Sequence, residues 1–232
     1  MDERLAALKL GIPLQFLKKE KVMAQLLGKL LASMDEKVIL KGGTAINFAY
    51  LRKRFSEDLD FDCFACRNFI SGPEFDGPWK FRETVRYHFV YQKPKDYVRV
   101  EIRKRKDYNP HKKFITIKNL NFFHGSIVAN VRTYSLEFLV ATKIGLLSER
   151  KDGKDFLDTY WGLKMCNPKG AISAVEKIEK KDSIVERAIN TIEQVNPKRL
   201  AIVNNYIPRD NRPQSWRLLL DELKETLENL GN

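Results

Sequence analysis

Two short segments near residue 50 hold residue types that could do chemistry. The first is Gly42-Gly43-Thr44, which follows the apolar run 38–40 and precedes the mostly apolar run 45–51. An apolar run that stops at glycines predicts a buried strand ending in a turn, and the run after Thr44 predicts a helix starting at or near Thr44. Glycines let the backbone approach an anion closely, and the first N–H groups of a helix have no partner within it, so the turn could hold a phosphate. The glycines alone would favour a plain tight turn.

The second segment carries alternating carboxylates. Asp58, Asp60 and Asp62 are separated by single apolar residues. On a strand, this spacing places the three carboxylates on one face. Like charges crowded on one face repel each other, so a cation is expected there, and Mg²⁺ held by carboxylates and substrate phosphates fits this chemistry. A solvated acidic strand edge is the alternative, whereas a calcium loop of the EF-hand type is excluded because Cys63 stands at its glycine position.

A third carboxylate is expected on a neighbouring strand. The run 98–103 predicts a strand in which Glu101 lies opposite the apolar side chains, and 85–91 predicts the strand before it, joined by a hairpin turn. Glu101 could complete a metal site or act as general base for an attacking hydroxyl. The alternative is a surface glutamate that pairs with the arginines on either side of it.

The chain is strongly basic, with a net charge of +12 over 232 residues. This charge indicates a polyanionic partner, although a heat-adapted surface rich in charged residues would also produce it. The basic residues concentrate in 99–113, where aromatic residues are interleaved, whereas 215–232 is acidic. Such a mixture is typical of a surface that contacts phosphates and stacks bases. The residues expected to bind RNA are Arg103, Lys104, Arg105, Lys106, Lys112 and Lys113.

Composition excludes several classes of protein. A hydrophobic content of 43% is ordinary for a globular protein and argues against disorder. Apolar runs are too short for a membrane span, and the N-terminus does not resemble a signal peptide, so a cytoplasmic protein without membrane contact is expected. Cys63 and Cys66 form a single CxxC without a second pair, which argues against a zinc site at these thiols.

The pattern of apolar residues changes near residue 133. The segment 18–33 predicts an amphipathic helix, and 37–131 alternates strand signals with one helix around a loop-rich interruption at 70–78. The later part predicts helices at 136–147, 154–163, 171–180, 183–195 and 215–230. An α+β fold is therefore expected, with a mixed-sheet domain over 1–132 and a helical domain over 133–232.

The first two helices of the second domain carry another group of charges. Lys143 lies among apolar neighbours, and a charged turn that includes Arg150 joins the helices. Asp155 and Asp158 are three residues apart and share a helix face. Composition alone would favour a solvated, salt-bridged helix pair.

The two groups of residues, in this order, resemble those of the AbiEii/AbiGii nucleotidyltransferase toxins, which belong to the DNA polymerase β-like nucleotidyltransferase superfamily. The matching segments lie at 42–61 and 136–160, so the resemblance runs from about Val38 to Tyr160. The chain departs from the family pattern at Lys154, where arginine is usual, and in its short length.

The resemblance implies a polymerase β-like fold and transfer of a nucleoside monophosphate from an NTP to an acceptor hydroxyl, with two Mg²⁺ ions and release of pyrophosphate. The metal ligands would be Asp58, Asp60 and Glu101, and the catalytic set would add Lys143 and Asp155. The NTP would be bound by Gly42, Gly43, Thr44, Arg54, Ser56, Lys143 and Asp158.

The resemblance also implies the toxin component of a type IV toxin–antitoxin or abortive-infection system, with a cognate antitoxin as partner and a tRNA 3′ end as acceptor. The residues themselves leave open a protein acceptor and a catalytically silent RNA-binding relative. A metal-dependent glycosyltransferase also uses Asp-x-Asp, but it leaves the Gly-Gly-Thr helix start unexplained.

Overall fold

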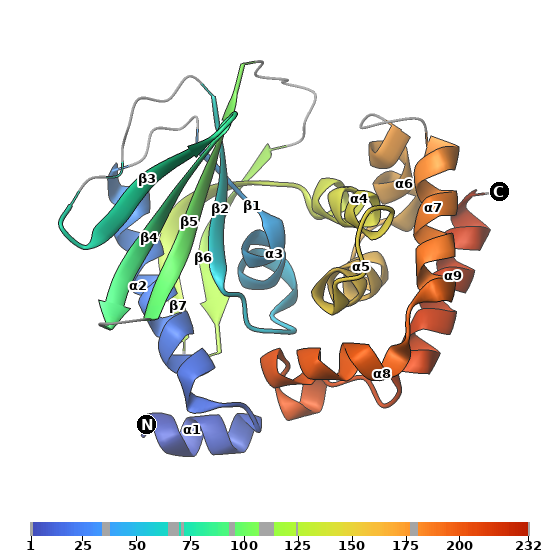
Figure 1. Ribbon diagram of the computed structural model, residues 1–232, viewed down its shortest axis with the longest axis horizontal. Coiled ribbons are helices and arrows are strands. Elements are labelled where there is room, and N and C mark those ends of the chain that lie inside the picture. Colours follow the sequence, from blue (N-terminus) through green and yellow to red (C-terminus); the bar gives the residue numbers. More distant parts are fainter. Residues whose placement is uncertain are drawn as a thin grey trace. The chain divides into compact units, whose positions relative to one another are not determined.

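The computed structural model describes residues 2–33, 38–64, 70, 72–92, 96–106, 114–123, 125–176 and 181–231. The chain divides into two compact units, Met1–Tyr134 and Ser135–Asn232. The sequence pattern predicts the boundary between the mixed-sheet domain and the helical domain two residues earlier, between residues 132 and 133. The first unit is coloured from blue to yellow-green in Figure 1, and the second from yellow to red.

The first unit is built on a mixed β-sheet. Its strands are β1 (Val38–Lys41), β2 (Asp58–Phe64), β3 (Phe75–Phe81), β4 (Thr84–Gln92), β5 (Asp96–Arg105), β6 (Phe114–Phe122) and β7 (Gly125–Tyr134). Among the described residues these seven strands lie in the order β3-β4-β5-β2-β1-β7-β6 (Figure 1). The pairs β2–β5 and β1–β7 are parallel and the other pairs are antiparallel. Together with the helices, this sheet confirms the expected α+β class.

Two helices precede the sheet and one helical segment interrupts it. They are α1 (Glu3–Leu10), α2 (Leu14–Ser33) and the continuous pair α3 (Gly42–Ala45) and η1 (Ile46–Leu51). Apolar residues at helical spacing in α2, among them Met23, Leu27 and Leu30, are buried where α2 packs along one face of the sheet (Figure 1). The η1 segment is a π-helix, in which the Arg52 amide donates to the Asn47 carbonyl oxygen five residues earlier at 2.8 Å.

Strand β3 was not expected, because the sequence pattern predicts a loop over 70–78. The strand contains Gly77-Pro78, and its pairing with β4 shifts register between Asp76 and Trp79. Proline within a strand is tolerated at a sheet edge or a bulge, and β3 is the edge strand with mostly exposed side chains. An edge strand exposed on both faces has no apolar alternation for a sequence pattern to detect.

The second unit is entirely helical in its described part. Its elements are α4 (Leu136–Leu147), α5 (Gly153–Met165), α6 (Pro168–Glu176), α7 (Lys181–Gln194), α8 (Pro197–Leu200), α9 (Trp216–Gly231) and the short 3₁₀ segments η2 (Ala201–Tyr206) and η3 (Arg209–Asn211). Side chains cap α4 and α5: the Phe138 amide donates to Ser135 Oγ at 3.4 Å, and the Lys154 amide donates to Asp152 Oδ1 at 2.9 Å. None of the helices that the structure describes is both long and apolar enough to cross a membrane.

Helix α4 forms the centre of this unit and contacts α5, α6 and α7. A Cβ atom added at Gly162 of α5 would lie 2.3 Å from Cγ2 of Val140 on α4, so glycine allows the two helices to approach closely. Because β-branched Val140 has few rotamers with which to move away, a larger residue at 162 would push the helices apart.

We therefore predict that Gly162→Ala lowers the free energy of unfolding by about 1–3 kcal/mol, the usual cost of overpacking. Gly145 on α4 provides a matched control, because nothing lies within 4 Å of an added Cβ atom there. Gly145→Ala should be neutral or stabilise the protein by up to about 1 kcal/mol, since alanine favours a helix over glycine. Urea unfolding monitored by circular dichroism measures both, and equal stability of Gly162→Ala and the parent protein would contradict close packing of α4 on α5.

Candidate active site

The turn after β1 brings the backbone against the acidic strand. Helix α3 begins at Gly42, two residues before the start at Thr44 that the sequence suggests. Gly42 has φ +70°, in the left-handed region that favours glycine, and an added Cβ atom would lie 2.6 Å from Oδ2 of Asp60. Glycine is thus required both by the conformation of the turn and by its closeness to the Asp60 carboxylate.

Hydrogen bonds attach this turn to the segment before β2 and to the first residue of β2. The Thr44 hydroxyl donates to the Asp58 carbonyl oxygen, and its oxygen lies 2.7 Å from the Ser56 hydroxyl oxygen. The Arg54 side chain is buried and donates to the Phe55 carbonyl oxygen at 2.8 Å. Of the residues expected to bind NTP, Thr44, Ser56 and Arg54 therefore have structural contacts that shape the turn.

Asn47 also belongs to this arrangement, although no sequence pattern points to it. Its amide nitrogen donates to the Gly43 carbonyl oxygen at 3.0 Å, and its amide oxygen accepts from the backbone N–H groups of Lys53 and Arg54 at 3.3 and 3.2 Å. Asn47 thereby fixes the start of the helix and the chain that leaves it. The only signal in the sequence is one polar residue within the apolar run 45–51.

The register of β2 and β5 places three carboxylates on one face of the sheet. The two strands are parallel, with Asp60 opposite Glu101 and Asp58 opposite Arg99. Asp58, Asp60 and Glu101 therefore share a face, which we term the acidic face, while Leu59 is fully buried on the other. The expectation that Glu101 lies on a strand beside the aspartates is confirmed.

The three carboxylates differ in their partners. Arg99 forms an ion pair with Asp58, and the Arg86 guanidinium lies 2.7 Å from Glu101 Oε1. The Asp60 carboxylate makes neither a hydrogen bond nor an ion pair within the part of the chain that the structure describes. Burial, followed by repulsion from Asp58 and Glu101, raises the pKa of Asp60 to about 6. The carboxylate at the centre of the group is therefore the one without an ion-pair partner among the described residues, although the charges of Lys41 and Arg99 act to lower its pKa.

Oxygen donors of this kind suit a divalent cation such as Mg²⁺. Across the described ranges, no three acidic, histidine or cysteine side chains are arranged as a ready-made metal site. Asp58 and Glu101 point to arginines instead. The chemistry of the donor set and the raised pKa of Asp60 fit a cation, and reorientation of Asp58 and Glu101 would be needed to bind it.

Asp62 differs from the other two aspartates of β2. It is almost fully buried and binds Lys41 Nζ at 2.6 Å, Arg105 Nε at 3.1 Å and the Tyr134 hydroxyl at 2.6 Å. Burial acts to raise the pKa of Asp62, but Lys41, Tyr134 and Arg105 outweigh burial and hold this pKa below its usual value. Asp62 is therefore an ionised structural residue with its own cations.

A second charged cluster lies inside the helical unit. Lys143 Nζ is 2.6 Å from Asp155 Oδ1 and 3.0 Å from Asp158 Oδ2, and Arg150 Nε is 2.6 Å from Asp155 Oδ2. Lys143, Asp155 and Asp158 are all buried, whereas the Arg150 side chain is 52% exposed. The alternative that these charges lie on the solvated surface of a helix pair is thus excluded for Lys143, Asp155 and Asp158. Lys154, where the family usually has arginine, places its ammonium 4.0 Å from the centre of the Tyr206 ring.

The basic residues of β5 do not share one face. Arg103 lies opposite Asp62 and Lys104 lies opposite Cys63, so successive side chains point to opposite sides of the sheet. Arg103 also lies 3.7 Å from Glu83, and Arg105 belongs to the Asp62 cluster. Lys112 and Lys113 lie outside the described residues.

Solved structures share this fold. JHP933 from Helicobacter pylori matches with a TM-score of 0.59 and 20% identity, covering 95% of this chain and 93% of that chain. MenT4, a nucleotidyltransferase toxin from Mycobacterium tuberculosis H37Rv, matches with a TM-score of 0.54 and 16% identity, covering 99% of this chain and 90% of that chain. Comparison with curated proteins gives no match.

A family model of nucleotidyltransferases matches most of this chain, so the protein is a nucleotidyltransferase. The family model described as nucleotidyl transferase AbiEii toxin, type IV toxin–antitoxin system, matches residues 25–86 and 70–230. The chain belongs to this AbiEii family, which confirms the resemblance seen in its sequence.

The buried cluster of the helical unit leads to a stability prediction. Lys143→Met would leave two buried carboxylates without their central cation, so we expect a loss of about 3–5 kcal/mol in the free energy of unfolding. Lys164 is the matched control, because it lies 2.8 Å from Glu222 in an exposed pair. Lys164→Met should cost less than about 1 kcal/mol. Urea unfolding at neutral pH compares the two, and similar losses would show that the Lys143 cluster is not a buried ion-pair network.

Proposed function

We propose that this protein transfers a nucleoside monophosphate from an NTP to a hydroxyl group of RNA in a Mg²⁺-dependent reaction that releases pyrophosphate. The observation that carries the proposal is the position of Asp60. It lies between Asp58 and Glu101, next to the Gly42 turn, and its pKa is raised to about 6 by burial and by these two carboxylates. A nucleotidyltransferase needs oxygen donors for metal beside a turn that can hold phosphate, and this face supplies both.

Asp58, Asp60 and Glu101 are the residues that would hold Mg²⁺. The metal, when bound, would stabilise charge on the attacking and leaving oxygens. The hydroxyl oxygen of the acceptor forms a bond to the α-phosphorus, the bond to pyrophosphate breaks in line with it, and the carboxylates of the acidic face can take the proton of the hydroxyl.

The turn at Gly42 and Gly43 is proposed to bind the phosphates through backbone N–H groups, which glycine leaves accessible. Thr44, Ser56 and Arg54 would support this turn, since their side chains already form hydrogen bonds within the protein.

The cluster of Lys143, Asp155 and Asp158 is also proposed to take part in nucleotide binding. The cluster contains two cations, Lys143 and Arg150. Arg150 is much more exposed than Lys143, so Arg150 is the better candidate to contact a phosphate.

RNA is the proposed acceptor because the chain carries a net charge of +12, and phosphate neutralisation supplies much of the affinity of proteins for nucleic acids. A tRNA 3′ end and a cognate antitoxin are the proposed substrate and partner, in keeping with the toxin family.

The acceptor is tested by incubating the protein with each α-³²P-labelled NTP, Mg²⁺, total RNA and a soluble protein extract. Label in a tRNA-sized band is expected, with one NTP preferred. Label confined to protein bands would replace the RNA acceptor with a protein acceptor, and label in neither fraction with any NTP would contradict nucleotidyl transfer to cellular macromolecules.

Asp60→Asn should abolish transfer without weakening the fold. We expect a decrease in rate of at least about 10²-fold, the scale of losing one electrostatic contact to the reacting groups. Because ionised Asp60 is repelled by Asp58 and Glu101, the variant should unfold at the same temperature as the parent or a higher one. Asp221→Asn, at an exposed position of α9, is the control and should change neither property. Transfer at the parent rate in Asp60→Asn would refute the assigned site.

A further inference from the structure

We propose that the acidic face continues, across β5, β4 and β3, into a binding surface for single-stranded RNA, which we term the aromatic platform. It consists of Trp79, Phe81, Arg86, His88, Tyr97 and Arg99. This inference rests on the proposed function, because it states where an RNA acceptor would lie.

Strand register places the platform and the acids on the same side of the sheet. Trp79 lies opposite Arg86, Arg86 lies opposite Glu101, and Glu101 lies opposite Asp60, so one row crosses four strands. Directly opposite residues point to the same face. At about 4.8 Å per strand, Trp79 is roughly 14 Å from Asp60 along this row, which is a span of a few nucleotides.

The aromatic rings form contacts along this surface. The ring centres of Trp79 and His88 are 4.6 Å apart, and those of His88 and Tyr97 are 4.0 Å apart in a stacked arrangement. The Arg86 guanidinium lies 4.9 Å from the centre of the Phe81 ring. Rings and guanidinium groups therefore alternate from the sheet edge toward the acids.

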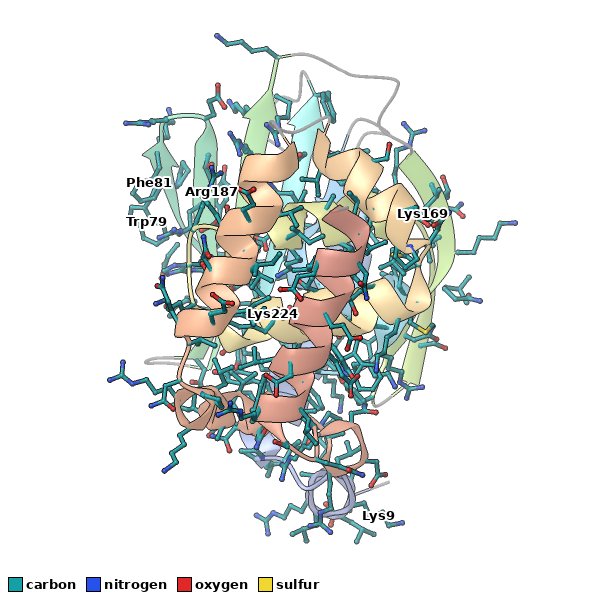
Figure 2. All side chains as sticks on the ribbon, turned by 90° about the vertical axis from the view of Figure 1, so that its right-hand side faces the viewer. Lys9, Trp79, Phe81, Lys169, Arg187 and Lys224 are labelled. Atoms are coloured by element: carbon teal, nitrogen blue, oxygen red, sulfur yellow. The ribbon has the colours of Figure 1, made fainter. Side chains whose placement is uncertain are left out.

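These rings are exposed although the first unit has a separate core. Trp79, Phe81 and Tyr97 are 41%, 52% and 43% exposed. Figure 2 shows the Trp79 and Phe81 side chains on β3 at the edge of the sheet. The core lies on the opposite face, where Tyr87 is buried and Phe75 packs against it. Large aromatic groups exposed on an edge strand favour aggregation, so their position requires another explanation, such as a ligand.

Single-stranded RNA fits this surface better than a duplex. Aromatic and guanidinium planes stack unpaired bases, whereas bases within a duplex are already stacked. The charges on this side are mixed, because Asp76 and Glu83 accompany Arg86, Arg99 and Arg103. Attraction to phosphate is therefore limited, and stacking should supply most of the affinity.

Binding of a fluorescein-labelled 12-nucleotide single-stranded RNA of mixed sequence, followed by fluorescence anisotropy, tests the platform. Trp79→Ala and Phe81→Ala should each weaken binding roughly fivefold or more, the lower end of stacking contributions. Trp79→Phe should retain most of the affinity, and Leu218→Ala, which removes an exposed apolar side chain from α9, should have no effect. Thermal unfolding of each variant verifies that it is folded. Affinities of Trp79→Ala and Phe81→Ala equal to that of the parent would overturn the proposal.

Transfer assays separate this inference from the proposed function. Trp79→Ala should raise the KM for the RNA acceptor and leave the KM for NTP near the parent value. Transfer to RNA with an unchanged KM for RNA in this variant would overturn the platform and leave the proposed function intact. If the parent labels only proteins and Trp79→Ala loses that labelling, the surface binds a protein and the RNA platform is wrong.

Discussion

The parallel pairing of β2 with β5 is the interaction on which the rest of the first unit depends. It sets Asp60 opposite Glu101, while β1 on the other side sets Lys41 opposite Asp60. Because side chains alternate along a strand, a shift of one residue would turn these charges into the core. Burial of Leu59 and Phe61 on one face of the sheet therefore fixes these charged side chains on the opposite face.

Neighbouring charges in this protein serve different purposes according to their partners. Asp62 is surrounded by Lys41, Arg105 and Tyr134, and it holds the sheet together as a buried anion. Asp60, two residues earlier on the same face of the strand, is repelled by its neighbours. A carboxylate that destabilises the fold on its own is expected where a ligand completes the site, and functional sites are where such conflicts concentrate.

The sequence predicts those parts of the fold that depend on local patterns. Alternating residues identify β2 and β5, and helical spacing identifies α2, α4 and α5 within a few residues of their bounds. Strand β3 escapes detection because Gly77-Pro78 and exposure on both faces remove the alternation. The residues of the family pattern are also close together in the sequence. The carboxylates of β2 and the glycine turn can therefore be identified from the sequence alone.

The features of the site that the sequence does not predict depend on contacts between residues that are far apart in the chain. The partners of Asp62 lie 21, 43 and 72 residues away along the chain, so nothing near Asp62 distinguishes it from Asp60. Likewise, the bond between Arg86 and Glu101 depends on strand register, and the role of Asn47 depends on the path of the chain after η1. The turn before Thr44 likewise depends on Gly42, which has φ +70°, a backbone conformation that other residues avoid.

The ion pairs of Asp58 and Glu101 have a consequence for ion selectivity. The guanidinium groups of Arg99 and Arg86 belong to the same chain as these carboxylates, so they compete with any dissolved cation for them at a high effective concentration. A monovalent ion brings no more charge than the guanidinium group it displaces, whereas a divalent ion brings twice as much. If Asp58 and Glu101 hold a metal ion, as the proposed function requires, this competition within the protein would favour divalent over monovalent ions without a cavity of fixed size.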